Sequence, residues 1–218
     1  MIVMLFEDER FENFLPLTYT RPVFELRSGM FTVLERVEKL FQGFKLLLFT
    51  RDYLSATLKH HGSHLVNTPD KVDDEALLIN GALPIDEKTV RLIGKKLDKN
   101  EVVIQEDRLV CARLSENVAR KCARVLSKPL TSSDLKALRK GCQVLRGEPF
   151  PLINYPWDLV DNCAELIRKD YLVSAAGESK GTTDEKVVVY GDKSNVFVGE
   201  GSFIEAFVTL DARNGPIY

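Results

Sequence analysis

Short apolar runs alternate with segments of helical periodicity over residues 1–170, and this alternation limits the possible folds more than any other feature of the sequence. The runs Ile2–Phe6, Leu46–Phe49 and Ala76–Ile79 predict three buried strands. Each is followed by a stretch in which apolar residues recur with helical spacing. Strands that alternate with helices are typical of a sheet covered by helices. We therefore predict an α/β fold.

The helices of this fold are expected to begin at residues that suit a first helical turn, mostly polar residues that can accept a hydrogen bond from it. These predicted starting residues are Ser28, Thr50, Asp86, Ser115, Thr131 and Pro156. Two further apolar runs, Val102–Gln105 and Leu109–Leu114, are separated by three charged residues and predict a β-hairpin.

Composition changes after Tyr171, which indicates that the chain has a second part. Residues 174–186 are mainly small and polar and predict a linker. We therefore expect an α/β domain at 1–173, a linker at 174–186 and a separate segment at 187–218.

Residues 187–218 carry a six-residue apolar period, because Val198, Ile204 and Leu210 stand six positions apart. This period is typical of a parallel β-helix, in which one aliphatic side chain per face points inward. The spacing alone also leaves open a β-hairpin meander. A β-helix coil buries its core face only against neighbouring coils. Since the chain stops in mid-pattern at Tyr218, we expect the β-helix to continue in a longer chain.

Charge, hydropathy and cysteine usage exclude several classes of protein. The 30 basic and 32 acidic residues give a net charge of −2, which offers no electrostatic reason to bind nucleic acid or an anionic membrane. No apolar run approaches the roughly 20 residues that cross a bilayer. The apolar run Met1–Phe6 is followed directly by three acidic residues, which is unlike a secretion signal. The four cysteines include no Cys-x-x-Cys pair, so we predict a reduced, cytoplasmic protein.

The segment after the first predicted strand carries the clearest motif. Residues 15–29 read Leu-Pro-Leu-Thr-Tyr-Thr-Arg-Pro-Val-Phe-Glu-Leu-Arg-Ser-Gly, and a Leu-Glu pair follows at 34–35. This resembles the same segment of the sugar-phosphate nucleotidyltransferases, which runs Pro-Leu-Thr, three residues, Pro-Lys, then Leu, Gly and a helix with Leu-Glu. The resemblance implies a Rossmann-like nucleotide-diphospho-sugar transferase domain.

Two further blocks make the resemblance more specific. Residues 78–84 (Leu-Ile-Asn-Gly-Ala-Leu-Pro) are similar to the strand end at which these enzymes contact the nucleotide base, the sugar and the metal ion. Residues 154–162 (Asn-Tyr-Pro-Trp-Asp-Leu-Val-Asp-Asn), with 5–8 and 215–218, resemble one subgroup. It comprises the alternative N-acetylglucosamine-1-phosphate uridyltransferase/glucosamine-1-phosphate acetyltransferase proteins. This subgroup implies a left-handed β-helix after the α/β domain, and a trimer formed through that β-helix.

The resemblance implies a nucleotidyltransferase. A hexosamine 1-phosphate oxygen would attack the α-phosphorus of UTP or another nucleoside triphosphate, release pyrophosphate and form an NDP-sugar, in the first instance UDP-N-acetylglucosamine. The expected partners are therefore a nucleoside triphosphate and a sugar 1-phosphate. Mg²⁺ is the expected cofactor, because such transfers depend on metal and cationic stabilisation of charge at phosphorus.

The resemblance also assigns roles to individual residues. The candidate catalytic residues, which would offset phosphate charge, are Arg21 and Arg10. The candidate substrate-binding residues are Asn80, Gly81, Thr18 and Asn154. The candidate Mg²⁺ ligands are Asp158 and Asp8, the latter with Glu7 beside it. The residues themselves leave structural roles open, since an Asn-Gly pair suits a tight turn and an aspartate suits the first turn of a helix.

Three departures from the family pattern favour an alternative function. Residues 7–10 (Glu-Asp-Glu-Arg) stand where the mainstream enzymes have a Gly-x-Gly-Thr-Arg loop whose backbone N–H groups cradle phosphates. Val23 replaces the expected lysine, and Ala82 the expected metal-binding aspartate. The alternative is a degenerate, non-catalytic domain that binds a sugar nucleotide or supports a C-terminal acyltransferase β-helix.

Overall fold

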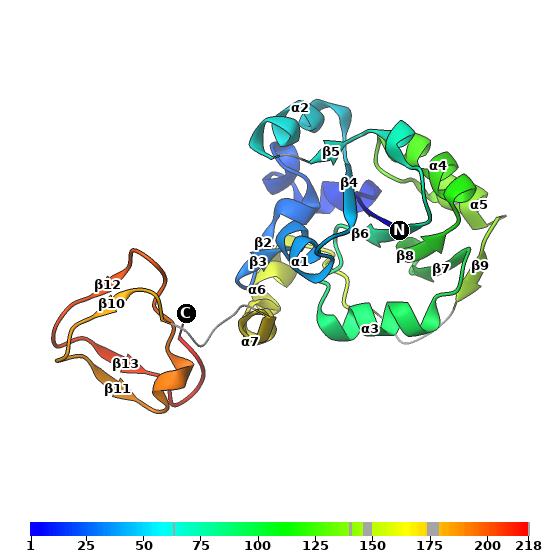
Figure 1. Cartoon of the computed structure of the whole chain (residues 1–218). Helices are drawn as coiled ribbons and strands as arrows, with labels where there is room; N and C mark the ends of the chain where they lie inside the picture. The colour runs from blue at the N-terminus through cyan, green and yellow to red at the C-terminus, as the bar shows by residue number, and fades with distance from the viewer. Residues whose placement is uncertain (63, 140, 146–149, 174–178, 218) are drawn as a thin grey trace. The chain divides into compact units, whose positions relative to one another are not determined.

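The computed structural model describes residues 1–62, 64–139, 141–145, 150–173 and 179–217 (Figure 1). The chain divides into two compact units, Met1–Asp161 and Asn162–Tyr218, and each unit is considered by itself. The linker predicted at 174–186 belongs to the second unit, and its residues 174–178 lie outside the described residues.

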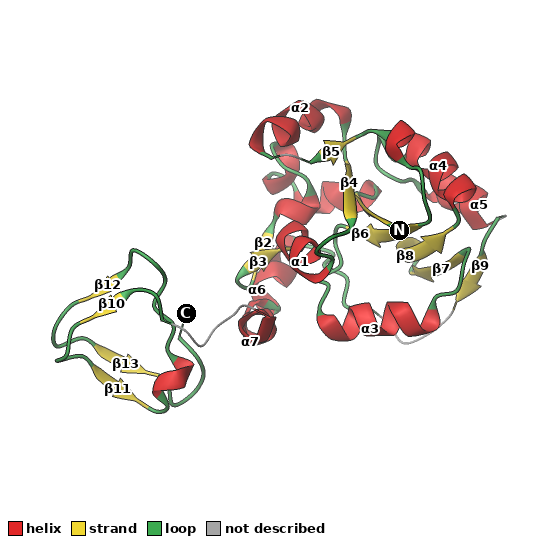
Figure 2. Cartoon of the chain, in the orientation of Figure 1, coloured by secondary structure: helices red, strands yellow, loops and turns green. Residues whose placement is uncertain are grey.

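A seven-stranded sheet forms the centre of the first unit, with strand order β5-β4-β1-β6-β8-β7-β9 (Figure 2). Its strands are β1 (Ile2–Phe6), β4 (Lys45–Phe49), β5 (Leu65–Val66), β6 (Ala76–Asn80), β7 (Glu101–Gln105), β8 (Arg108–Leu114) and β9 (Gln143–Leu145). Only β8 runs against its neighbours β6 and β7, and the other pairs are parallel. The predicted α/β fold and the predicted hairpin are confirmed.

Helices cover both faces of this sheet (Figure 1). They are α1 (Val33–Leu40), α2 (Asp52–His61), α3 (Glu87–Lys96), α4 (Glu116–Val125) and α5 (Ser132–Arg139). The short α6 (Pro156–Asp161) instead contacts β2 (Arg27–Ser28). The side chains of β1 alternate between two cores. Met4 and Phe6 pack in the core that includes α4 and α5, and Val3 and Leu5 in the core that includes α1, α2 and α3. A strand buried on both faces reads as a continuous apolar run, which is why β1 was detectable in the sequence.

Two predicted helix starts are wrong. The helix expected from Ser28 begins at Val33, because 27–32 form the antiparallel pair β2 (Arg27–Ser28) and β3 (Phe31–Thr32). Thr32 then caps α1 through a reciprocal capping box with Glu35. Thr50 does not cap α2, since Arg51 occupies the N-cap position and makes no side-chain capping bond. The hydroxyl of Thr50 is instead engaged by a buried carboxylate described below.

The second unit contains α7 (Cys163–Val173) and four short strands, β10 (Thr182–Thr183), β11 (Val188–Tyr190), β12 (Phe203–Ile204) and β13 (Thr209–Asp211). The strands pair in parallel, β10 with β12 and β11 with β13, and Val196 and Ile217 form a parallel bridge. In each pair a residue meets the one 21 positions later in the chain. These residues therefore do not form the antiparallel meander that the spacing left open.

Candidate active site

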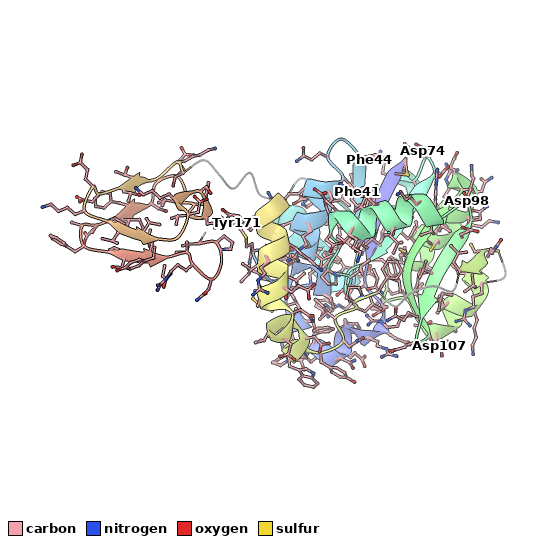
Figure 3. All side chains as sticks on the ribbon, turned by 90° about the horizontal axis from the view of Figure 1, so that it is seen from below. Phe41, Phe44, Asp74, Asp98, Asp107 and Tyr171 are labelled. Atoms are coloured by element: carbon pink, nitrogen blue, oxygen red, sulfur yellow. The ribbon has the colours of Figure 1, made fainter. Side chains whose placement is uncertain are left out.

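Polar side chains gather at the edge of the sheet where β1, β4 and β6 end. Figure 3 identifies this edge: Asp74 and Asp98 precede β6 and β7 on one side of the sheet, and Asp107, in the β7–β8 turn, lies on the opposite side. In open α/β sheets, ligands bind outside the carboxyl ends of the strands. The segment 7–26, which leaves β1, and the segment 150–159 both lie at this edge, joined by a small apolar cluster that includes Phe14 and Ile153.

Asp8, the second residue after β1, is the centre of one buried network. Its side-chain oxygens accept hydrogen bonds from four donors. Arg108 contributes two, with Nε 2.7 Å from Oδ2 and Nη2 3.2 Å from Oδ1. Asn80 Nδ2 lies 2.8 Å from Oδ2, and the backbone nitrogen of Arg10 lies 3.1 Å from Oδ1. Asp8, Asn80 and Arg108 are 7%, 1% and 4% exposed, so this is a buried, bidentate ion pair.

Asn154 extends the network to the start of α6. Arg108 Nη1 donates to Asn154 Oδ1 at 2.6 Å. The backbone nitrogens of Asn154 and Tyr155 both donate to Asp158 Oδ2, at 2.7 and 3.0 Å. The structure thus brings the predicted residues Asp8, Asn80, Asn154 and Asp158 into one connected group.

Glu7 is the centre of a second buried network beside the first. Its side chain is fully buried and accepts from the backbone nitrogen of Val23 at 2.9 Å, from Thr50 Oγ1 at 2.5 Å and from Arg51 at 3.2 and 3.3 Å. Arg51 also lies over the ring of Phe11, 4.1 Å from its centroid. Since carboxylates are almost never buried unless paired, this arginine allows a buried acidic residue to follow β1 directly.

The two predicted catalytic arginines lie around these networks. The carbonyl of Arg21 accepts a hydrogen bond from Arg51 Nη2 at 3.1 Å, while the residue itself is exposed. The backbone of Arg21 is therefore fixed and its side chain faces solvent. Arg10 is half-buried, and its Nη2 donates to the carbonyl of Glu106 at 3.3 Å.

Two of the predicted substrate-binding residues have evident structural roles. Thr18 is fully buried and its hydroxyl donates to the carbonyl of Phe11 at 2.9 Å, so it stabilises the loop after β1. Asn80 Oδ1 accepts from the backbone nitrogen of Ala82 at 2.8 Å, and Asn80 Nδ2 also donates to the carbonyl of Leu109. The turn that the Asn-Gly pair suggested is thus formed, and its side-chain amide is used within the protein.

The carboxylates of Asp8 and Asp158, the predicted Mg²⁺ ligands, both accept hydrogen bonds from groups of the protein. The four hydrogen bonds to Asp8 occupy the four lone-pair positions of its carboxylate. Asp158 accepts from two backbone nitrogens, as an acid in a first helical turn does. Among the described residues, no group of three or more His, Cys, Asp or Glu side chains could hold a metal ion. In the structure Asp8 is the partner of an arginine and Asp158 holds the start of α6; their assignment as Mg²⁺ ligands stays a prediction.

Arg108 and Arg51 are the site residues that sequence reasoning missed. Arg108 comes 100 positions after Asp8, and Arg51 comes 44 after Glu7. A signal was present, because two acidic residues directly after a buried strand require buried counter-charges. Both arginines belong to the same sheet region. Arg108 is the first residue of β8, and Arg51 comes two residues after the end of β4.

Gly81 allows the close packing of the turn after β6. Its backbone nitrogen donates to the carbonyl of Phe6 at 2.7 Å. A Cβ at this position would lie 2.9 Å from Phe24 Cδ1 and 3.0 Å from the backbone oxygen of Phe6. The first contact is closer than real Cβ atoms make and the second is unusually tight, so Gly81 serves the packing beneath the site.

We expect Gly81→Ala to lower the free energy of unfolding by about 1–3 kcal/mol, because the added methyl group overpacks the turn. Gly94→Ala is the matched control, since nothing lies within 4 Å of a Cβ there. Within α3 this change should stabilise the protein by up to roughly 0.5–1 kcal/mol. Urea denaturation of both variants measures the two effects. If both variants change the free energy of unfolding in the same direction, the packing role of Gly81 is contradicted.

Two of the four cysteines lie in the cores of the first unit. Cys111 and Cys122 are buried in the two cores, and burial raises the pKa of each thiol to about 12. Since the thiolate is the nucleophile, neither residue is activated for covalent catalysis.

Comparison with known proteins gives one family match. The model of a family described as sugar nucleotidyl transferase matches residues 3–179. No curated protein matches the chain. No helix in the described part of the chain has the length and apolar character to span a bilayer.

Two solved structures are similar to the chain at low identity. Molybdopterin-guanine dinucleotide biosynthesis protein A from Archaeoglobus fulgidus has 12% identity and a TM-score of 0.47, over 75% of this chain and 97% of that one. A putative glucose-1-phosphate thymidylyltransferase from Bacillus anthracis, in complex with a sucrose, has 14% identity and a TM-score of 0.48, over 77% and 95%.

Proposed function

We propose, since the chain belongs to the sugar nucleotidyl transferase family, that it forms an NDP-sugar from a nucleoside triphosphate and a sugar 1-phosphate. An oxygen of the sugar 1-phosphate attacks the α-phosphorus. The bond from that phosphorus to the oxygen bridging to the β-phosphate breaks, and pyrophosphate leaves with the electron pair. The family match carries the proposal, and the buried polar networks at the carboxyl ends of β1 and β6 support the choice of site.

The exposed side chain of Arg21 is proposed to bind phosphate oxygens. Its backbone is held by Arg51, which is itself fixed by the buried carboxylate of Glu7. A guanidinium on a fixed backbone reaches a phosphate with little loss of backbone freedom, and its planar donors match phosphate oxygens. Arg10, at the rim of the Asp8 network, is proposed as a second phosphate contact. Asn80, Gly81 and Asn154 would then shape and hold the floor on which the substrates lie.

The finer identity of the substrates is proposed from the subgroup motifs. UTP and N-acetylglucosamine 1-phosphate are the first pair to test, because residues 154–162 and 5–8 resemble the uridyltransferase subgroup. In this proposal Mg²⁺ enters as part of the substrate, bound to the nucleoside triphosphate, and neither Asp8 nor Asp158 is its ligand.

The second unit is proposed to begin a left-handed β-helix of the acyltransferase type. The parallel strand pairs of residues 182–217 and the burial of Val198 support this proposal. A trimer formed through this β-helix and a cytoplasmic location stay predictions.

We expect release of pyrophosphate when the protein is mixed with UTP, Mg²⁺ and N-acetylglucosamine 1-phosphate. Arg21→Ala should lower kcat/KM at least tenfold, which corresponds to about 1.4 kcal/mol of lost transition-state stabilisation. Arg91→Ala, which removes an arginine from an exposed ion pair on α3, is the control and should leave kcat/KM unchanged.

A binding measurement separates the enzyme from its non-catalytic alternative. Trp157 is the single tryptophan of the chain, is exposed and stacks on Tyr155 beside Asn154, so its fluorescence reports on the site. Binding of UDP-N-acetylglucosamine without turnover of any nucleoside triphosphate and sugar 1-phosphate pair would identify a binding domain. If no pair reacts and no sugar nucleotide alters Trp157 fluorescence, the proposed function is wrong.

A further inference from the structure

Arg108 holds the position at Asp8 that a divalent cation would need. Its guanidinium contacts both oxygens of the carboxylate, and Asn80 and the Arg10 backbone nitrogen take the remaining lone pairs. A metal ion could bind Asp8 only after displacing this guanidinium. The space lined by Asp8, Arg10 and Arg108 measures about 10 Å³, which is roughly room for one water molecule.

Displacement of Arg108 would be costly because the residue is held from several segments of the chain. Its side chain is only 3% exposed, and its third nitrogen, Nη1, donates to Asn154. Removing one partner from a buried ion pair leaves an unpaired buried charge. Mg²⁺ gives up its own water ligands reluctantly, so it is a poor competitor for this position.

A second carboxylate of the acidic loop after β1, that of Glu7, is neutralised in the same way. Arg51 pairs with Glu7, and both side chains are buried. Glu7 and Asp8 therefore each have their own arginine. Without these arginines, the two carboxylates would repel a polyphosphate. With them, the floor of the site carries no net charge from Glu7 and Asp8, and no metal ion is needed to achieve this.

We infer that Arg108 is the built-in cation of this site and replaces a protein-bound metal ion at Asp8. Arg108 acts as a positioning residue: it neutralises Asp8 and holds Asn154 without itself touching the reacting atoms. For the nucleotide, the inference rests on the proposed function and predicts that a sugar nucleotide binds without any metal bridge to the protein. The part of the inference that concerns metal binding depends only on the contacts of Asp8.

The metal part is tested by Mn²⁺ titration of the full chain without nucleotide, with free Mn²⁺ measured by electron paramagnetic resonance. Wild type and Asp8→Asn should bind Mn²⁺ equally, because Asp8 contributes no site. Arg108→Ala should bind Mn²⁺ at least tenfold more tightly than wild type, which corresponds to about 1.4 kcal/mol, since it frees the carboxylate. Arg113→Ala is the matched control: it lies on the same strand and pairs with Glu75, and it should bind like wild type.

Two results would overturn the metal part. The first is a wild-type Mn²⁺ site that Asp8→Asn removes, and this comparison stands even if Arg108→Ala does not fold. The second is a folded Arg108→Ala protein that binds Mn²⁺ no more tightly than Arg113→Ala.

The nucleotide part is tested by titrating UDP-N-acetylglucosamine against Trp157 fluorescence in EDTA and in Mg²⁺. The two dissociation constants should agree within about twofold, and a tenfold weaker affinity in EDTA would overturn the inference. Absence of binding in both buffers would count against the proposed function, and the Mn²⁺ titration would then decide the inference by itself.

Discussion

Replacing Arg51 by alanine is expected to lower the free energy of unfolding by about 3–5 kcal/mol, because the change leaves a buried carboxylate without its counter-charge. The Glu7 side chain is fully buried, and that of Arg51 is 7% exposed. Two other donors, Val23 N and Thr50 Oγ1, would remain on Glu7. These two donors fill hydrogen-bonding positions of the Glu7 carboxylate but do not balance its charge. The variant also loses the stacking of the guanidinium over Phe11.

Urea denaturation followed by Trp157 fluorescence measures this loss, since Trp157 belongs to the same unit as the pair. Arg27→Ala is the control. Arg27 pairs with Glu35, but the two side chains are 55% and 38% exposed, and an exposed pair contributes about 0–1 kcal/mol. The double variant Glu7→Gln with Arg51→Ala should recover part of the loss, because the unpaired charge is gone. A loss no greater than that of Arg27→Ala would show that the buried pair does not hold the loop.

Most of the sheet could be predicted from the sequence because short local apolar runs indicate its strands. β1 has the predicted bounds, β4 begins one residue earlier than expected, and β6 extends one residue further, through Asn80. The helix expected from Ser28 was placed too early, since Thr32 and Glu35 form a capping box that outweighs the serine. β9 was missed, because a three-residue strand at a sheet edge has no detectable period.

The site could be predicted only in part. The segments were correct, since Asp8, Asn80, Asn154 and Asp158 lie in one network. The contacts of Asp8 and Asn80 were not predicted, because their partners lie far away in sequence. Arg108 joins Asp8 across 100 residues, and no local period or spacing encodes such a contact. Buried charges are a useful guide to these partners: a buried acid directly after a strand implies a buried base nearby, although not its position in the sequence.

Phe6→Ala is expected to have an effect as large as that of Arg51→Ala, and for a different reason. Phe6 is the last residue of β1, is fully buried and packs in the core that includes α4 and α5. Truncation of a buried phenylalanine removes its favourable transfer from water and leaves a cavity, which together cost about 3–5 kcal/mol. In a chain of this length, each kcal/mol lowers the melting temperature by roughly 2–4 °C.

The cavity would lie directly beneath the acidic loop, because Phe6 precedes Glu7 and its carbonyl accepts the hydrogen bond from Gly81. We therefore expect Phe6→Ala to weaken sugar-nucleotide binding as well as to lower the melting temperature. Phe44→Ala is the matched control: its side chain is 44% exposed and meets Phe41 edge to face, so its loss should be less than half as large. Thermal melts of both variants, with and without UDP-N-acetylglucosamine, separate the two effects. A Phe6→Ala protein that melts no lower than Phe44→Ala would mean that the core under the site does not depend on this ring. If it melts lower but keeps the wild-type affinity, the loop is held by Arg51 and Arg108 rather than by the core beneath it.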